Sequence, residues 1–256
     1  MLPELLTPIG PEQAAQYILD SRFWVQEKRD GVRLIVRKRH NQIDGWNRQG
    51  QPVAVARILA SALLAINVPS FVLDGELEQN GGYHCWDLLE ANDFALLDQP
   101  YAVRYRALEA FYGCSMIHVL PSWTTHTDKE TMAFALQRKR AEGLVFKNAE
   151  APYRPGRAGQ HYKLKFEKHA TVRVRDVDPV RNRVSIEMMD GNTWHEVCGL
   201  KVTHGTVRPG DFVEVKYLYG TPGRRLVQPR FLCVRTDVSD ADCRFSQVEL
   251  GGKWQR

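Results

Sequence analysis

The stretch VQEKRDGVRLIVRK, residues 25–38, places two runs of alternating apolar residues on either side of an Asp-Gly pair. Alternation of this kind predicts two β-strands, and Asp30-Gly31 between them is typical of a tight turn. The sequence therefore predicts strand, turn and strand over residues 23–36. The simplest interpretation is an ordinary hairpin with its charged side chains in water.

Three cations, Lys28, Arg29 and Arg33, crowd this turn and suggest a second interpretation. Neighbouring positive charge disfavours the ammonium form of a lysine, and a neutral amine can attack an electrophile. The pattern Lys-x-Asp-Gly-x-Arg is only moderately specific. From these residues alone, the nucleophilic lysine and the solvated hairpin remain two open alternatives.

The composition is that of a globular protein, with 256 residues, 43% hydrophobic and 25% charged, and no low-complexity tract. This length allows one or two domains, and we expect two. No apolar run reaches the roughly 18 residues that span a bilayer, and the amino terminus lacks a signal-peptide pattern. We expect a cytoplasmic protein with no membrane partner, acting as a monomer.

The cysteines and the net charge limit the kinds of site that the chain can hold. Its five cysteines are widely spaced without a Cys-x-x-Cys pair, which indicates reduced structural thiols and neither a zinc site nor a disulfide framework. The net charge is +5, and residues 168–256 carry 15 basic against 11 acidic side chains. This balance is compatible with a polyanionic partner.

Periodicity and turn residues divide the remaining chain into elements. The spacing predicts helices over residues 11–22, 53–67, 103–112 and 129–141, the last opened by a capping box at Thr127-x-x-Glu130. Residues 71–89 read as two strands joined by Asn-Gly-Gly. Beyond residue 169 short β-rich runs predict a small barrel or sandwich, so we expect domains over 1–168 and 169–256.

Polar residues within the strand-like runs are candidates for chemistry. They are Lys28, Asp30, Arg33, Glu76, Glu142, Lys147, Lys163 and Lys165. Four lysines and an arginine suit a polyphosphate, and alternate positions in YKLKF point two lysines to one face of a strand. The two glutamates could hold a divalent cation. A solvated edge strand and surface salt bridges are the alternatives.

The order of these segments resembles the covalent nucleotidyltransferases, and within them the ATP-dependent DNA ligases. EKRDGVR is similar to the nucleotidyl-lysine motif of that family, NRQG (residues 47–50) to the arginine motif that follows, and LDGELE to the third motif. HCWDLL, EGLVFK and YKLKF resemble the purine-stacking segment and the fourth and fifth motifs. VEVKY and QPRFLCVRTD (residues 228–237) are similar to the terminal strands of the ligase OB domain.

The resemblance implies an α+β nucleotidyltransferase (adenylation) domain of antiparallel sheets with flanking helices, followed by an all-β OB-fold domain. It implies an ATP-dependent DNA ligase that seals 5′-phosphate/3′-hydroxyl nicks through a lysyl-AMP intermediate and a DNA-adenylate. The implied cofactors are ATP and Mg²⁺ or Mn²⁺, and the implied partner is nicked duplex DNA. Lys28 would attack the α-phosphate of ATP and expel pyrophosphate.

The resemblance also assigns roles to other residues. Arg33 and Arg48 would contact the sugar and phosphates, Glu76 the ribose hydroxyls, and Trp86 would stack on adenine. The α-phosphate would be held by Lys163 and Lys165 with Lys147 near the same charge, and the metal by Glu142 with Asp30.

The sequence departs from the family pattern in three places. The family often has glutamate two residues before the nucleophile, whereas here Gln26 holds that place and Glu27 follows, so either could read the adenine. Tyr162 stands where tryptophan is usual, and no lysine follows the last motif. The residues left to assist self-adenylylation from the OB domain are Arg230, Arg235 and Asp237.

Three basic groups are candidates for DNA phosphate contacts: Arg37-Lys38-Arg39, Arg138-Lys139-Arg140 and Arg224-Arg225. Because only 27 residues precede the predicted nucleophile, we expect the two domains alone to grip DNA. Two other functions stay open. One is an RNA ligase or a GTP-dependent RNA capping enzyme, and the other is a non-catalytic nucleic-acid-binding protein.

Overall fold

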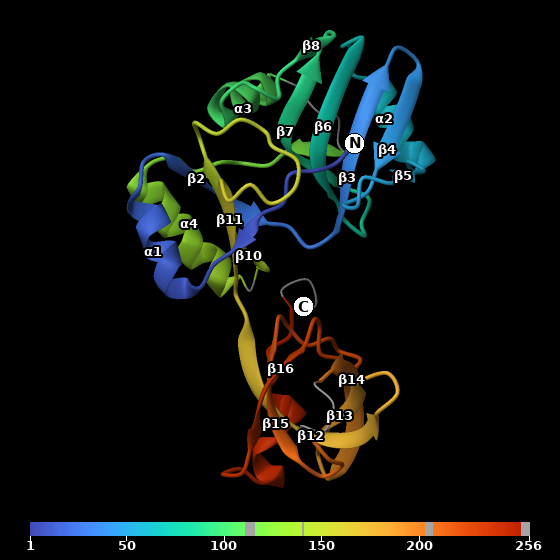
Figure 1. Ribbon diagram of the computed structural model, residues 1–256, viewed down its shortest axis with the longest axis vertical. Coiled ribbons are helices and arrows are strands. Elements are labelled where there is room, and N and C mark those ends of the chain that lie inside the picture. The colour runs from blue at the N-terminus through green and yellow to red at the C-terminus, as the bar shows by residue number, and fades with distance from the viewer. Residues whose placement is uncertain (111–115, 140, 203–206, 252–256) are drawn as a thin grey trace. The chain divides into compact units, whose positions relative to one another are not determined.

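The computed structural model describes residues 1–110, 116–139, 141–202 and 207–251. The chain forms two compact units, residues 1–165 and 166–256, each with its own core (Figure 1). The sequence predicted the boundary at 168/169.

The larger sheet of the first unit is mostly antiparallel, with strand order β5-β4-β3-β6-β7-β8 and β9 beside β7. Its strands are β3 (Val32–Arg39), β4 (Gln42–Trp46), β5 (Pro52–Val53), β6 (Ser70–Leu77), β7 (Tyr83–Ala91), β8 (Phe94–Ala95) and β9 (Ile117–Val119). Helices α2 (Arg57–Leu64) and α3 (Tyr101–Glu109) contribute side chains to one core with this sheet, including Leu63 and Tyr105. The predicted hairpin at residues 71–89 is therefore the centre of this sheet.

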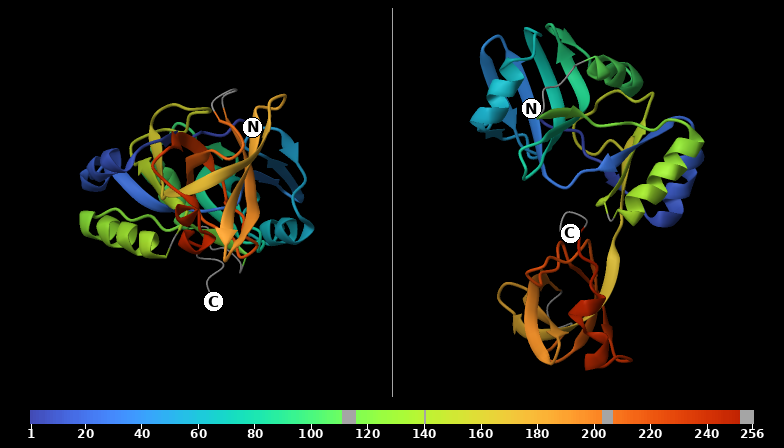
Figure 2. Two further views of the ribbon diagram at one scale, coloured as in Figure 1. Left: turned by 90° about the horizontal axis from the view of Figure 1, so that it is seen from below. Right: turned by 180° about the vertical axis from the view of Figure 1, so that it is seen from behind.

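The smaller sheet has the order β1-β11-β10-β2 and carries a helix pair. Its strands are β1 (Thr7–Pro8), β2 (Phe23–Lys28), β10 (Gly143–Asn148) and β11 (His161–Lys165). Helices α1 (Pro11–Leu19) and α4 (His126–Arg138) lie side by side on one face, as the rear view in Figure 2 also shows. Tyr17 of α1 packs on Phe23, Phe146 and Tyr162 of that face, which leaves the opposite face for the site.

The hairpin expected at Asp30-Gly31 is not formed. β2 pairs with β10, whereas β3 pairs with β4 and β6. The turn therefore carries the chain from one sheet to the other. Gly31 is required there because a Cβ would collide with the backbone carbonyl of Leu77.

All four helices begin or end at other residues than predicted, and the starts of two of them have an identifiable local cause. α2 begins at Arg57 because residues 52–53 pair as β5 with β4. α4 begins at His126, and its cap is Thr125, whose hydroxyl accepts a hydrogen bond from the Asp128 N–H at 3.2 Å. The predicted cap at Thr127 is therefore wrong by two residues.

The second unit is a five-stranded antiparallel sheet with the order β14-β13-β12-β15-β16. Its elements are β12 (Lys168–Asp178), β13 (Arg183–Asp190), β14 (Thr193–Lys201), β15 (Phe212–Tyr217), β16 (Arg230–Arg235) and two short 3₁₀ helices, Asp240–Asp242 and Phe245–Gln247. Alternating apolar residues such as Val172, Val213 and Val215 face one core. The short β-rich runs predicted beyond residue 169 thus form a single sheet that packs around that core.

No helix in the described part of the chain is long and apolar enough to cross a membrane. Cys85, Cys198 and Cys243 are buried free thiols and Cys233 is exposed, while Cys114 lies outside the described residues.

Candidate active site

The free face of the smaller sheet arranges the predicted residues in rows. Strand register places Lys28 of β2, Gly143 of β10 and Lys165 of β11 in one row. The next row on the same face holds Gln26, Val145 and Lys163, and the third holds Trp24, Lys147 and His161. Residues two apart on a strand share a face, so residues far apart in sequence become neighbours.

The first row holds the candidate nucleophile. The Nζ of Lys28 lies 2.6 Å from Oε2 of Glu142, whose Oε1 lies 3.2 Å from Nζ of Lys165. Glu142 immediately precedes Gly143, where a Cβ would collide with the Leu164 carbonyl and where φ is +158°. The glycine thus lets β10 approach β11 closely enough for one carboxylate to serve both lysines.

The crowding of uncompensated cations that the sequence suggested is not observed. Arg29 turns to Glu27 at 2.9 Å and to Glu78 at 2.6 Å. Arg33 forms a two-pronged ion pair with the buried Asp74. Each of the three cations at the turn is thus paired with a carboxylate, which Lys28 shares with Lys165, because burying a charge without a partner is costly.

The larger sheet supplies the opposite wall of the site. In β3 and β6 Arg33 lies directly across from Glu76, and the guanidinium carbon of Arg33 lies 5.3 Å from the ring centre of Trp86 in β7. Burial alone would lower the pKa of the Arg33 guanidinium, but Asp74 outweighs that effect and raises it, so Arg33 stays charged. The wall therefore offers a fixed cation, a carboxyl group and an aromatic face.

Two groups facing the cavity have strongly shifted pKa values. Burial, together with the charge of Glu142, raises the pKa of Glu76 to about 7 although Lys28 opposes the shift. Burial, with Arg48 and Lys28 as neighbouring cations, lowers the pKa of Lys163 to about 8. Such shifts gather where a site is built to receive a charged ligand.

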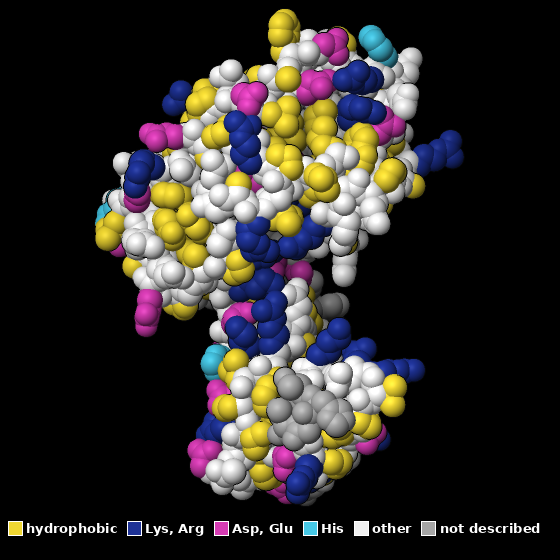
Figure 3. Space-filling view, in the orientation of Figure 1, with side chains coloured by type: hydrophobic (Ala, Val, Ile, Leu, Met, Phe, Trp, Pro, Cys, Tyr) yellow, Lys and Arg dark blue, Asp and Glu magenta, His cyan; other side chains and the backbone are white. Residues whose placement is uncertain are grey.

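A cavity of 390 Å³ lies between the two sheets of the first unit. The predicted residues that line it are Gln26, Glu27, Lys28, Arg33, Arg48, Glu76, Trp86, Lys147 and Lys163. Lys165 and Glu142 do not line it but lie behind Lys28 as described above. Figure 3 shows Lys and Arg side chains gathered around the end of β11.

Lys147 lies at the other end of this cavity from Lys28. Four residues of β10 separate its row from that of Lys28, which is about 13 Å at roughly 3.3 Å per residue. The structure therefore places Lys147 apart from Lys28, whereas the sequence predicted it near the α-phosphate that Lys28 would attack. Its ammonium lies 4.8 Å from the ring centre of Tyr101 and, among the described residues, makes no hydrogen bond or ion pair.

Gln26 and Glu27 differ in their freedom to read a base. The amide nitrogen of Gln26 donates to Ser122 Oγ at 2.8 Å and to Tyr101 Oη at 3.0 Å, which fixes the orientation of the amide. Glu27 is ion-paired with Arg29. Gln26 also shares the face of Lys28, whereas Glu27 alternates to the other face.

Sequence reasoning missed several lining residues. Glu4, Leu5 and Leu6 form part of the wall, and Asn47 and Gln49 flank Arg48. Residues 4–6 belong to no motif, and contacts with distant segments bring them here: β1, which follows them, pairs with β11, and Glu4 forms a β-bridge with Gly156. The local sequence carries no signal for this position.

The carboxylates fit a metal ion shared with phosphates better than a metal held by protein alone. No group of three or more His, Cys, Asp or Glu in the described residues could hold a metal ion. Mg²⁺ is usually bound through one or two carboxylates together with water and phosphate oxygens. Glu142 immediately precedes the row of Lys28 and pairs with its ammonium, and Asp30 lies in the turn that follows β2.

The predicted DNA-binding groups differ in accessibility. Lys38 is buried and donates to the carbonyls of Leu64 and Ile66 at 2.9 and 2.6 Å, so its prediction as a DNA contact is wrong. Ion pairs join Arg37 to Asp44, Arg39 to Glu90, Arg224 to Asp190 and, at 3.9 Å, Arg225 to Glu196. Arg138 and Lys139 end α4, and Arg140 lies outside the described residues.

The residues expected to assist from the second unit lie on and after β16. Arg235 forms ion pairs with Asp237 and Glu214, both at 2.7 Å, and its hydrogen bonds lower the pKa of Asp237 to about 2. Arg230 is exposed and lines an open groove of 720 Å³ together with Arg183, Lys201 and Phe231.

Comparison with known protein families gives a match that covers part of the first unit. A family model described as the ATP dependent DNA ligase domain matches residues 77–165. No curated protein matches the sequence significantly.

Several solved structures share the fold. A Lig E DNA ligase described as binding DNA with a minimal scaffold has a TM-score of 0.69 at 17% identity over 92% of this chain and 99% of its own. A structure named Pmar-Lig_Pre has a TM-score of 0.71 at 16% identity, covering 92% and 67%. Mycobacterial DNA ligase D complexed with ATP has a TM-score of 0.57 at 18% identity, covering 95% and 97%.

Proposed function

We propose that this chain is an ATP-dependent DNA ligase and that it seals nicks in duplex DNA through a lysyl-AMP intermediate. The match of the family domain over residues 77–165 supports the first part of the proposal. The observation that carries the proposal is the cluster in which Glu142 pairs with both Lys28 and Lys165, together with the cavity in which Lys28 faces Arg33, Glu76 and Trp86.

In the first step the amine of Lys28 attacks the α-phosphate of ATP. A phosphorus–nitrogen bond forms, the bond to the β-phosphate oxygen breaks, and pyrophosphate leaves. Glu142 pairs with the ammonium form of Lys28 before the reaction and is the nearest carboxylate to its proton. The reaction needs positioning and charge neutralisation more than proton transfer, which suits fixed cations such as Lys163 and Lys165.

The remaining steps transfer AMP to the nick. The 5′-phosphate oxygen attacks the lysyl-AMP phosphorus and Lys28 is released, which leaves a DNA-adenylate. The 3′-hydroxyl then attacks the 5′-phosphorus, the phosphodiester bond forms and AMP leaves. Mg²⁺ or Mn²⁺ bound near Glu142 and Asp30 would neutralise phosphate charge.

The nucleotide is oriented by the rest of the cavity. Trp86 offers its ring to the adenine, and Glu76 faces the ribose. Gln26 is the better candidate of the two to read the base, since its amide nitrogen is fully engaged and its oxygen remains as an acceptor for the adenine amine. The ammonium group of the buried Lys147 is a hydrogen-bond donor at the end of the cavity where the base would lie, which we call the base end.

We propose an OB fold for the second unit and a role for its open groove in holding the DNA backbone. The cations lining the groove, Arg183, Lys201 and Arg230, form no ion pair with any described residue, whereas Arg224 is neutralised by Asp190. Arg183 and Lys201 also lie directly opposite each other in β13 and β14. Like charges in that position destabilise a sheet, so a polyanion is the partner that they suit.

Mass spectrometry after incubation with ATP and Mg²⁺ tests the proposal. We expect an AMP adduct on Lys28, no adduct in Lys28→Ala, and an unchanged adduct in the control Lys139→Ala at the exposed end of α4. Sealing of a nicked DNA duplex is expected from the wild-type protein and not from Lys28→Ala. An adduct formed from GTP alone would contradict the assignment of ATP.

A further inference from the structure

Glu4 lies in the wall of the cavity although no sequence motif includes it. Its backbone N–H donates to Tyr153 Oη at 2.9 Å, and its backbone carbonyl accepts from Arg33 Nη1 at 2.5 Å. The residue is 3% exposed and lines the cavity with Leu5 and Leu6. The segment therefore fixes Arg33, the cation that lies against Trp86.

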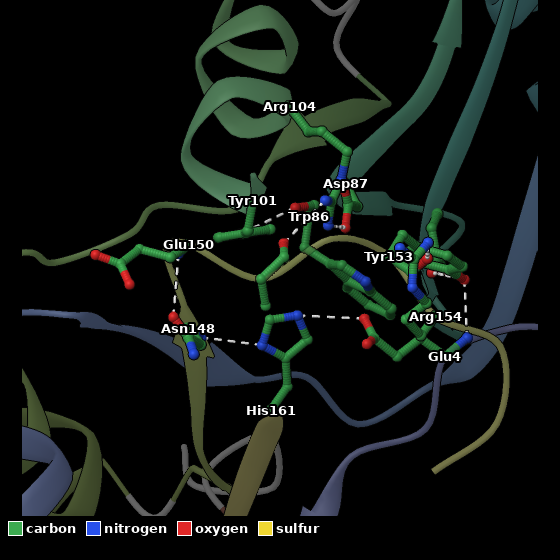
Figure 4. A network of polar contacts seen from close by, with 12 residues as sticks. Glu4, Trp86, Asp87, Tyr101, Arg104, Asn148, Glu150, Tyr153, Arg154 and His161 are labelled. Atoms are coloured by element: carbon green, nitrogen blue, oxygen red, sulfur yellow. Dashed lines mark hydrogen bonds and ion pairs between the residues drawn. The ribbon is translucent and has the colours of Figure 1, made fainter. Parts of the chain in front are cut away.

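The Glu4 carboxylate faces His161 (Figure 4). Its Oε2 lies 3.2 Å from His161 Nε2, but neither carboxylate oxygen makes a hydrogen bond of good geometry with the described residues. The Asn148 N–H donates to His161 Nδ1 at 3.0 Å, so a neutral ring carries its hydrogen on Nε2, toward Glu4. Burial and the charge of Lys147 lower the pKa of His161 to about 4, so the ring is neutral near pH 7.

Glu4 therefore lacks a cationic hydrogen-bonding partner in the described structure. Burial raises the pKa of Glu4, but His161 and Lys147 outweigh it and lower the pKa overall, so the group is a carboxylate. Lys147 is a buried cation that lacks a directly bound carboxylate among the described residues. Burial lowers its pKa, while Asp87 and Glu4 oppose the shift.

The groups around Lys147 show which of them can serve as its counter-charge. They are Glu4, Asp74, Asp87, Tyr101, Arg104 and His161. Asp87 is held by Arg104 through two contacts of 2.7 and 2.8 Å, and Asp74 is held by Arg33. Of these three carboxylates only Glu4 is not already bound to an arginine side chain among the described residues.

We propose that Glu4 is a positioning residue of the nucleotide site, whose buried carboxylate keeps Lys147 charged at the base end of the cavity. The inference rests on the proposed function for the identity of the nucleotide as ATP. It assigns to the segment of residues 3–6 a part in nucleotide binding that no motif indicates. The ligand chemistry it serves is a purine with an unprotonated ring nitrogen, which accepts a hydrogen bond from an ammonium group.

Glu4→Gln keeps the shape of the side chain and removes its charge. We expect the KM for ATP in Lys28-AMP formation to rise about tenfold at pH 8 with kcat changed less than about twofold. Loss of the carboxylate lowers the pKa of Lys147 further, so the rise of KM with pH should begin at least about one pH unit lower. Glu4→Asp should restore part of the wild-type KM, and Glu12→Gln on exposed α1 is the matched control.

A double-mutant cycle of Glu4→Gln with Lys147→Met separates action through Lys147 from a purely structural role of Glu4. If Glu4 acts through Lys147, Glu4→Gln should add little to the KM of Lys147→Met. Lys38→Met controls for the loss of a buried lysine away from the cavity, and thermal unfolding confirms that each variant is folded. A KM and pH profile equal to wild type in Glu4→Gln, or fully additive effects in the cycle, would overturn the inference.

Equilibrium binding of ATP in the Lys28→Ala background distinguishes this inference from the proposed function. Calorimetry should give a Kd about tenfold higher when Glu4→Gln is added. If the wild-type protein formed no adduct but binding still depended on Glu4, the proposed function would fail and the inference would stand. An unchanged Kd would remove the inference and leave the proposed function intact.

Discussion

Several of the cations around Lys28 are held by carboxylates from other segments of the chain. Glu142 serves Lys28 and Lys165, while Asp74 serves Arg33. The sequence singled out the cations because lysines and arginines in strand-like runs are conspicuous, and the structure brings several of them to one cavity. It could not predict the pairing, since the carboxylates come from other strands. The proposed reaction therefore requires that the incoming nucleotide displace Glu142 from Lys28.

Glu76 links the site to the stability of the fold. Its pKa is raised from 4.5 to about 7, mainly by burial, so the folded state holds a proton that the unfolded state has lost between these values. Stability from this group is present below pH 4.5 and is lost as pH rises through 7. The difference in free energy of unfolding between Glu76→Gln and wild type should therefore shift in favour of the variant by roughly 2 to 3 kcal/mol when the pH is raised from 5 to 8.

Urea unfolding of both proteins at the two pH values measures this difference. Glu12→Gln, which is exposed, should show no such dependence. A gain that is the same at pH 5 and pH 8 would mean that Glu76 titrates near its ordinary pKa.

At the scale of elements, strand register decides what the site contains. The patterns in residues 23–28, 143–148 and 161–165 predicted three strands, and alternation correctly placed Lys163 and Lys165 on one face. Their order in the sheet follows from contacts between segments more than a hundred residues apart. That order brings Lys28 beside Glu142 and carries Lys147 to the far end of the cavity.

Gly143 makes this register possible, and Gly143→Ala should be strongly destabilising. The added Cβ would collide with the Leu164 carbonyl, so β10 and β11 would have to separate. We expect a loss of at least about 3 kcal/mol in urea unfolding, together with loss of Lys28 adenylylation. Gly191→Ala is the control, at a φ of +60° with nothing within 4 Å, and should cost only about 1 to 2 kcal/mol.

The cap of α4 provides a second test at this scale. Thr125→Ala removes the acceptor of the Asp128 N–H and should cost about 1 kcal/mol. Thr127→Ala, one residue inside the helix start and exposed, should change stability much less. Chemical denaturation measures both, and a larger cost at Thr127 would restore the cap that the sequence predicted.

At the scale of the whole molecule, some basic side chains form ion pairs with carboxylates and others do not. The runs of basic residues that stand out in the sequence are largely neutralised, as in Arg37 with Asp44 and Arg224 with Asp190. The groove of the second unit joins cations that are scattered in the sequence, Arg183, Lys201 and Arg230. For this reason the proposed DNA contact is placed at the groove and not at the runs of basic residues.

Arg183→Ala combined with Lys201→Ala tests this distribution. Binding to nicked duplex DNA should weaken, and the slope of log K against log salt should become shallower by about 0.9 for each DNA phosphate that the variant no longer neutralises. The variant should be no less stable than wild type, because the two like charges lie opposite each other. Arg224→Ala is the paired control, and a larger decrease in DNA affinity there would argue against the groove.

The sequence by itself determined the kinds of elements, the positions of the lysines and glutamates, and the alternation that turns them to one face. These features depend on periods of two or 3.6 residues and on turn chemistry, which act within a few positions of the chain. Only the tertiary structure decided that β2 and β3 enter different sheets, that Lys28 meets Glu142 across 114 positions, and that Glu4 closes the cavity. The physical reason is that strand partners and counter-charges are chosen by burial, which is a property of the assembled core and of no single segment.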